Sequence, residues 1–331
     1  MLKNFNNNLK ENAKVLFKTR KKYKIVSIAT AANINNPPIY FASYRESENT
    51  ITLPIIINNL EYIQDIILFF DYKIDFFLIG TESNYKIINF LEKCGRLIQN
   101  SKILYFKPND LTVDTVKNYF LQNKIINKNI LICGLGNIGT KLALTLVEMS
   151  NHIYLKSSNV EKMRIIADTL NIVSKSDRII KTWGVNNISV DYIIGTSAGV
   201  PVITKKDIDC LSDAGRIIDV GNGTISQDAL EKALGRGIRI RCVNFIEEYR
   251  TFIERAILPC DSDSDTDKIT VGNNTFIKVG MIGRENDILV NDPADIKKIY
   301  GICNGKGDLL YGDQIDEKLK EIKRVMGLEN N

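Results

Sequence analysis

The spacing of apolar residues along this chain predicts helices that alternate with strands. An amphipathic helix is expected first, because five apolar residues recur three or four positions apart: Leu2, Phe5, Leu9, Ala13 and Leu16. Apolar runs typical of buried strands follow at 24–31, 39–44, 75–79 and 103–106. Helical spacing separates them at 60–70 and 87–91. This alternation predicts a parallel sheet covered by helices.

The alternation restarts at Ile130, after a helix predicted at 111–121 and a polar stretch at 123–129. Six strand segments follow, at 130–133, 152–155, 178–181, 192–194, 216–220 and 238–243. Six strands are what the two halves of a doubly wound dinucleotide-binding sheet require. The predicted fold class is therefore α/β, with an N-terminal α/β domain followed by a doubly wound Rossmann domain.

The segment 130–139 joins a predicted strand to a helix through the glycine motif G-x-G-x-x-G. Gly134 permits a tight turn, Gly136 lets the backbone approach a pyrophosphate, and Gly139 lets the helix pack closely on the strand. The backbone N–H groups of Asn137 and Ile138 open the helix and are available to the anion. The motif predicts a dinucleotide site, the alternative being an ordinary glycine-rich turn.

The end of the next strand indicates which dinucleotide is bound. An NAD-specific site has a carboxylate there that holds the ribose 2′-hydroxyl. This chain has Lys156, Ser157 and Ser158 instead, a cation and two hydroxyls that suit a 2′-phosphate. We therefore expect NADP as the cofactor, with NAD as the alternative if Lys156 is only a solvated lysine.

Two later strands, at 192–194 and 216–220, run into small polar residues. The candidate residues after them are Thr196, Ser197, Ala198, Gly221 and Asn222. Ligands of doubly wound sheets bind beyond the carboxyl ends of the strands, so we expect these residues to flank the nicotinamide. The alternative is that the glycines of these loops only shape turns.

These motifs divide the chain into three predicted parts. Residues 1–122 form a substrate domain, residues 123–245 an NAD(P)-binding Rossmann domain, and residues 246–331 a C-terminal extension. In the extension we expect a hairpin at 275–290 and a helix at 314–326 that returns toward the first domain.

Composition and charge narrow the partners. The 331 residues include 44 Lys and Arg against 39 Asp and Glu, and this net charge of +5 is spread along the chain, which predicts no nucleic-acid partner. The uncharged run 25–44 contains asparagines and two prolines, so it predicts a strand and a turn rather than a membrane span. The six cysteines form no C-x-x-C pair, which disfavours a zinc ribbon or a disulfide-linked secreted scaffold. We expect a cytoplasmic protein without a membrane partner.

Few residues are suited to metal binding or imidazole chemistry. The single histidine, His152, excludes mechanisms that need two imidazoles. The alternating acids of 261–267 lack the glycine and the glutamate of a calcium loop, so a solvated loop and no metal site are expected.

The motifs at 134–139, 156–158, 195–197 and 218–221 resemble the cofactor half of shikimate dehydrogenases and methylenetetrahydrofolate dehydrogenases. Residues 215–235 also resemble the NAD domain of D-2-hydroxyacid dehydrogenases and S-adenosylhomocysteine hydrolases. The resemblance covers residues 108–245 and implies a two-domain NAD(P)-dependent dehydrogenase, without naming a substrate.

Departures from these families bear on the mechanism. D-2-hydroxyacid dehydrogenases place an arginine where this chain has Asn222, and they use a late histidine that this chain lacks. In shikimate dehydrogenases an Asn-Thr-Asp motif supplies an aspartate that works with an earlier lysine, whose motif is not visible here. The resemblance implies that Asp110 takes this catalytic role, with Lys107 and Asp114 as the next candidates. The alternative is that Asp110 caps the helix predicted to begin at Leu111.

Together these features predict an oxidoreductase in which hydride passes between NADP(H) and a small polar metabolite in a cleft between two domains, while a side chain moves a proton. One alternative is a lyase or hydrolase that uses a tightly held NAD transiently. Another is a regulatory protein that binds a nicotinamide cofactor without catalysis. A homo-oligomer is compatible with the sequence, which carries no signal for the substrate or the direction of reaction.

Overall fold

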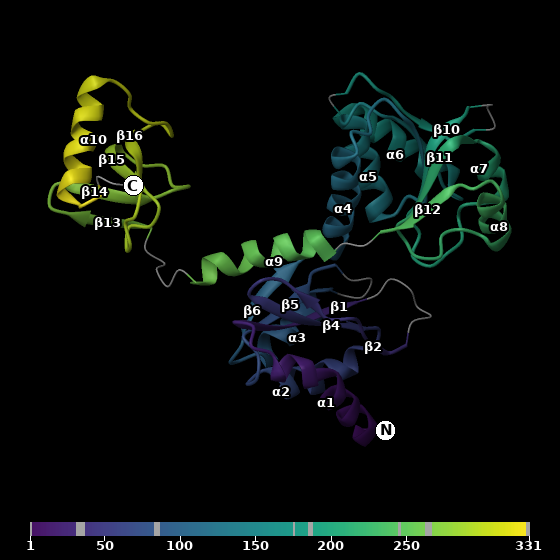
Figure 1. Ribbon diagram of the computed structural model, residues 1–331, viewed down its shortest axis with the longest axis horizontal. Coiled ribbons are helices and arrows are strands. Elements are labelled where there is room, and N and C mark those ends of the chain that lie inside the picture. The colour runs from purple at the N-terminus through teal and green to yellow at the C-terminus, as the bar shows by residue number, and fades with distance from the viewer. Residues whose placement is uncertain are drawn as a thin grey trace. The chain divides into compact units, whose positions relative to one another are not determined.

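The computed structural model describes residues 2–30, 37–82, 87–174, 176–184, 188–243, 246–261 and 267–328. The chain divides into two compact units, residues 1–255 and residues 256–331. Figure 1 labels the helices and strands of both. Among the described residues, the first unit contains two six-stranded sheets and the second unit a four-stranded sheet.

The first sheet is formed by the N-terminal part of the chain. Its strands are β1 (Tyr23–Thr30), β2 (Ile39–Phe41), β3 (Arg45–Glu46), β4 (Thr50–Ile57), β5 (Phe76–Gly80) and β6 (Lys102–Phe106). β1, β4, β5 and β6 pair in parallel, whereas the short β2 and β3 pair antiparallel with β4. The central strands β4 and β5 are buried along almost their whole length, because both faces of a parallel sheet are covered.

Helices cover both faces of this sheet. On one face lie α1 (Leu2–Lys18), the 3₁₀ turn η1 (Leu60–Tyr62), α2 (Ile63–Phe70) and α3 (Ile87–Leu97), which share one apolar core. The other face receives the part of α9 (Ile246–Asp261) that belongs to the first unit, from much later in the chain (Figure 1). The Tyr249 hydroxyl of α9 donates to Thr52 Oγ1 at 2.9 Å, and burial raises the pKa of Tyr249 to about 12. Tyr249 therefore stays neutral and anchors α9 to β4.

The second sheet has the strand order β12-β11-β10-β7-β8-β9, with every pair parallel. Its strands are β7 (Asn129–Cys133), β8 (His152–Lys156), β9 (Ile180–Thr182), β10 (Val190–Gly195), β11 (Leu211–Asp219) and β12 (Arg239–Cys242). This is the order of a doubly wound dinucleotide-binding sheet, which switches direction between its first and fourth strands. The predicted fold class is confirmed, and the switch point lies between β7 and β10.

Helices again cover both faces of the second sheet (Figure 1). One face carries α4 (Pro108–Gln122), α5 (Asn137–Glu148) and α6 (Val160–Val173), and the other carries α7 (Lys205–Asp209) and α8 (Gln227–Gly235). On α4, the ring of Phe120 is fully buried, with its centroid 5.2 Å from that of Tyr192 on β10. The helix predicted at 111–121 is therefore part of the second core.

The second unit contains β13 (Lys268–Val271), β14 (Asn274–Lys278), β15 (Glu285–Val290), β16 (Ile299–Asn304) and α10 (Asp313–Val325). The hairpin predicted at 275–290 is wrong, because β14 and β15 pair in parallel. The antiparallel hairpin is instead β13 with β14, which turn at Gly272, whose φ is +60°. α10 buries its apolar stripe in the core of its own unit, where Ile322 packs with Phe276 and Ile288.

Among the described residues, no helix combines the length and the apolar character that crossing a membrane requires. The same part of the chain holds no group of three or more His, Cys, Asp or Glu side chains suited to a metal ion. Most of the acidic run at 261–267 falls on residues 262–266, outside the described residues.

Candidate functional site

The loop between β7 and α5 is held by close backbone contacts. Gly134 has a φ of +101°, and its carbonyl oxygen accepts a hydrogen bond from Thr196 Oγ1 at 2.7 Å. A Cβ atom at Gly139 would lie 2.1 Å from that same carbonyl oxygen, far inside van der Waals contact. Gly134 therefore makes the tight turn, and Gly139 lets α5 start directly beside the loop.

Gly136 has a different environment, since a Cβ atom there would meet no atom within 4 Å. Gly136 is the N-cap of α5, and no side chain caps the helix. Among the described residues, no side chain accepts from the first backbone N–H groups of α5, and the helix dipole favours negative charge beside them. This open helix start has the geometry that a bound pyrophosphate needs.

A cavity of about 420 Å³, here called the glycine-loop pocket, adjoins the start of α5. Its lining residues come from the end of β8, the first turn of α6 and the loops that follow β7, β8 and β10: Gly134, Leu135, Gly136, Lys156, Ser157, Ser158, Lys162, Ser197, Pro201, Val202 and Thr204. Six of the predicted cofactor residues are among them. Asn137, Ile138, Gly139, Thr196, Ala198, Gly221 and Asn222 do not line this pocket.

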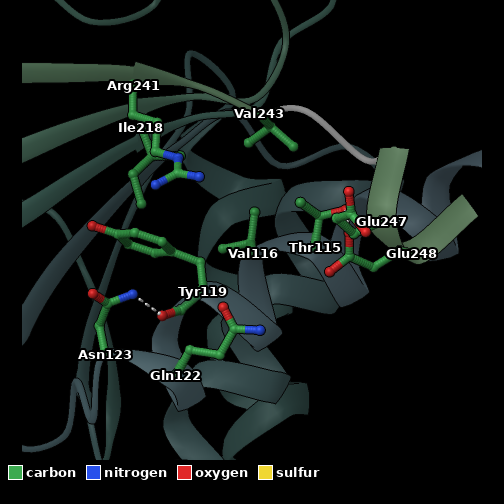
Figure 2. A pocket seen from close by; sticks show the side chains of 10 residues that line it. All are labelled: Thr115, Val116, Tyr119, Gln122, Asn123, Ile218, Arg241, Val243, Glu247 and Glu248. Atoms are coloured by element: carbon green, nitrogen blue, oxygen red, sulfur yellow. Dashed lines mark hydrogen bonds between the residues drawn. The ribbon is translucent and has the colours of Figure 1, made fainter. Parts of the chain in front are cut away.

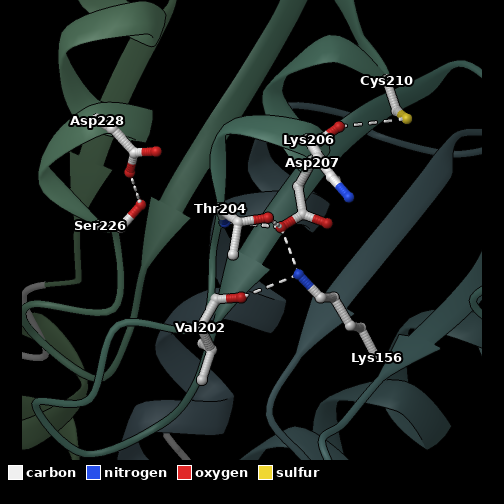
Figure 3. A network of polar contacts seen from close by, with 8 residues as sticks. All are labelled: Lys156, Val202, Thr204, Lys206, Asp207, Cys210, Ser226 and Asp228. Carbon is white, nitrogen blue, oxygen red and sulfur yellow. Dashed lines mark hydrogen bonds and ion pairs between the residues drawn. The ribbon is translucent and has the colours of Figure 1, made fainter.

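The ammonium group of Lys156 already has partners within the protein (Figure 3). It pairs with the carboxylate of Asp207 and donates to the Val202 carbonyl oxygen at 3.1 Å. The Asp207 side chain is 3% exposed and also accepts from the Thr204 backbone N–H and hydroxyl, at 2.7 and 2.8 Å. A buried carboxylate therefore neutralises the charge of Lys156.

A second lysine of this pocket was missed by the sequence analysis. Lys162 lies in the first turn of α6 and lines the pocket with Ser157 and Ser158. Within the described part of the chain its ammonium group makes no ion pair. Lys162 follows the end of β8 closely in the sequence, and this position could have identified it as a candidate for contact with the ribose end of the cofactor.

The loops after β10 and β11 also meet through their backbones. A Cβ atom at Gly221 would lie 1.9 Å from the Ser197 carbonyl oxygen, and one at Gly195 would lie 1.9 Å from Thr224 Oγ1. Asp219 holds the second loop by accepting from Gly223 N–H and Thr224 Oγ1, each at 2.8 Å. The two glycines permit the close approach of these loops, and Thr196 joins the loop after β10 to Gly134.

A second cavity, of about 390 Å³, lies at the carboxyl ends of β5 and β6. We call it the Asp110 pocket, and it is lined by Thr81, Tyr105, Phe106, Lys107, Asp110, Leu111, Asp114 and Phe252. The three residues predicted to be catalytic, Asp110, Lys107 and Asp114, thus line one cavity. The rings of Phe106 and Phe252, with centroids 6.2 Å apart, give it an apolar wall.

Asp110 does not cap a helix. Helix α4 begins at Pro108 with Lys107 as its N-cap, so Asp110 lies in the first turn. Its carboxylate forms an ion pair with Lys141 of α5, whose Nζ atom is also 3.6 Å from Glu82 Oε1. Glu82 in turn accepts from the Asn109 backbone N–H at 2.6 Å.

The charges around Lys141 keep it protonated. Burial lowers the pKa of Lys141, but the hydrogen bond with Asp110 and the charges of Asp110 and Glu82 outweigh burial and raise it. The sequence analysis missed Lys141 and Glu82, because neither belongs to a motif and each meets Asp110 or its neighbour only through folding. The resulting arrangement is a carboxylate held beside a cavity by a permanent cation.

No protein-family model matches the chain, and no curated protein matches it. Among solved structures, a shikimate dehydrogenase in complex with NADP+ is 16% identical, with a TM-score of 0.43 over 70% of this chain and 88% of that chain. A shikimate 5-dehydrogenase from Listeria monocytogenes, in complex with shikimate and NAD, is 12% identical, with a TM-score of 0.41 over 70% and 91%. A dipicolinate synthase chain from Bacillus halodurans is 13% identical, with a TM-score of 0.37 over 74% and 82%. Similarity of this degree assigns no activity, so the functional argument depends on the two pockets.

The two glycines at the start of α5 give a direct test of the loop geometry. Gly139→Val should destabilise the protein by about 2 kcal/mol or more, because its side chain would overlap the Gly134 carbonyl. Gly136→Val should cost much less stability, because nothing lies within 4 Å of its Cβ and the main cost is a poorer N-cap residue. Thermal unfolding without any added ligand measures both, and equal losses in the two variants would contradict the described loop.

Proposed function

We propose that the protein is an NADP(H)-dependent oxidoreductase acting on a small polar metabolite. The observation that carries the proposal is the open start of α5 at Gly136, at the switch point of a doubly wound sheet. Ligands of such sheets bind in this place, and the helix start favours a pyrophosphate. The bound dinucleotide supplies or accepts hydride, and the residues of the chain bind it, orient it and move the proton.

The charges of the glycine-loop pocket favour a dinucleotide that carries a 2′-phosphate. Its lining includes Lys156 and Lys162 and no carboxylate. Asp207 neutralises Lys156, so the cation left for a 2′-phosphate is Lys162, with the hydroxyls of Ser157 and Ser158 beside it. In this proposal Lys162 binds the 2′-phosphate, and Lys156 fixes the end of β8 to α7.

The Asp110 pocket is the proposed substrate site. Asp110 accepts or returns a proton at the substrate oxygen or nitrogen while hydride moves. Lys141 positions the carboxylate, and its raised pKa keeps it cationic through neutral pH. Lys107 and Asp114, which line the same cavity, provide further polar contacts to a small polar molecule.

Calorimetric titration with NADP and NAD tests the cofactor assignment. The wild-type protein should bind NADP more tightly, and Lys162→Ala should weaken NADP binding by about 1 to 3 kcal/mol without changing NAD binding. Lys156→Ala should weaken NADP binding less, because Asp207 already holds that ammonium group. Gly136→Val is the control for the pyrophosphate and should bind neither dinucleotide.

Two results would overturn this assignment. Equal or tighter binding of NAD by the wild-type protein would show that the charges of the pocket do not select NADP. Full dinucleotide binding by Gly136→Val, in a protein that melts normally, would place the pyrophosphate away from α5.

Replacement of Asp110 tests the proposed proton transfer. Asp110→Asn keeps an oxygen that accepts from Lys141 but cannot be ionised, so the rate of NADPH oxidation with a responsive carbonyl compound should fall about 10²- to 10⁴-fold. The melting temperature should change little. Asp168→Asn, at an exposed carboxylate on α6, is the matched control and should keep the wild-type rate. Wild-type turnover by Asp110→Asn would exclude Asp110 as the acid or base.

A further inference from the structure

A third cavity, of about 170 Å³, shares no lining residue with the glycine-loop pocket or the Asp110 pocket. Figure 2 shows its walls, which come from α4, the ends of β11 and β12, and the start of α9. We call it the Arg241 pocket. Its polar lining residues include Thr115, Tyr119, Gln122, Arg241, Glu247 and Glu248. Nothing in the proposed oxidoreductase reaction uses these residues.

One side of the pocket is cationic. The guanidinium carbon of Arg241 lies 4.8 Å from the ring centroid of Tyr119, and the Tyr119 hydroxyl accepts from Arg216 Nη1 at 3.0 Å. Stacking on the ring occupies one face of the guanidinium and leaves its N–H edge available. Considering the described residues only, no carboxylate pairs with Arg241. Its positive charge is therefore uncompensated.

The opposite side is anionic. Glu248 accepts hydrogen bonds from the Thr115 hydroxyl at 3.3 Å and from the Asn118 amide at 3.2 Å, and both donors are neutral. The neighbouring Glu247 differs, since it forms an ion pair with Arg250 at 2.9 Å. As far as the structure describes the chain, no cation pairs with Glu248. Figure 2 shows Glu248 across the pocket from Arg241.

From this arrangement we propose that the Arg241 pocket binds a small zwitterion. The ligand's carboxylate meets the guanidinium of Arg241, whose paired N–H groups match a carboxylate, and its ammonium group meets Glu248. Val116, Ile218 and Val243 also line the pocket and suit a short carbon chain. At about 30 Å³ per water-sized group, 170 Å³ has room for about five or six non-hydrogen atoms. A short amino acid fits both the size and the two charges.

A ligand held at both ends links two parts of the first unit. Arg241 belongs to the edge strand of the second sheet, whereas Glu248 precedes Tyr249, which is anchored to Thr52 of the first sheet. Bridging of the two charges should therefore raise the melting temperature, because the ligand binds the folded arrangement and not the unfolded chain.

The experiment is a titration of the full chain with glycine and β-alanine, which have five and six non-hydrogen atoms, followed by calorimetry and thermal unfolding. Acetate and ethylammonium, which each carry one charge, are the matched probes. At least one zwitterion should bind at least about tenfold more tightly than either singly charged probe. Arg241→Met and Glu248→Gln should each weaken that binding at least about tenfold, and Glu248→Gln removes the charge while its amide oxygen still accepts from Asn118.

The control variant is Arg239→Met, on the same strand but outside the pocket, which should bind the zwitterion as the wild-type protein does. Circular dichroism confirms that each variant is folded. The proposal is overturned if no zwitterion binds the wild-type protein, or if Arg241→Met and Glu248→Gln both bind it unchanged. Loss of binding in Asp110→Asn, with Arg241→Met unaffected, would assign the ligand to the Asp110 pocket instead.

Discussion

The close approach of three backbone loops at the carboxyl ends of β7, β10 and β11 is the constraint on which the proposed cofactor site depends. Cβ atoms at Gly139, Gly195 and Gly221 would each lie 1.9 to 2.1 Å from an oxygen of a neighbouring loop or strand end. The loops are therefore in contact in the absence of a ligand. The Thr196 hydroxyl, in the loop after β10, donates to the Gly134 carbonyl oxygen in the loop after β7. Because the neighbouring loops pack this tightly, the open space at Gly136 has a defined shape, and it is the anion site that we propose at the start of α5.

Charge pairing then distinguishes groups that hold the fold from groups available to ligands. Lys156 and Lys162 line one pocket, yet Asp207 neutralises only Lys156. Asp110 and Lys141 form a pair beside a cavity, so the carboxylate that we propose for proton transfer is held in position by a cation. Arg241 and Glu248 line a third cavity, and the described residues supply neither with an opposite charge. The charged groups that have no partner among the described residues indicate which ligand charges each pocket can bind.

The sequence was sufficient to predict the elements that depend on local motifs and on the spacing of apolar residues. The strand, glycine turn and helix at 129–148 are encoded within 20 consecutive residues, and six strand segments were enough to predict the doubly wound order. Contacts between distant residues were not predictable. Lys141 meets Asp110 over a separation of 31 residues, and Lys156 meets Asp207 over 51, because elements that no motif connects pack side by side. The parallel pairing of β14 with β15 was missed because short apolar segments look the same in either direction.

A crystal structure of the protein with NADP+ bound tests the central claim most directly. The account predicts that the pyrophosphate lies within hydrogen-bonding distance of the backbone N–H groups of Asn137 and Ile138. It also predicts that the 2′-phosphate lies beside Lys162, Ser157 and Ser158, and that the Lys156 to Asp207 pair is retained. A dinucleotide bound away from the start of α5, or bound there with its 2′-phosphate turned away from Lys162, would contradict the account.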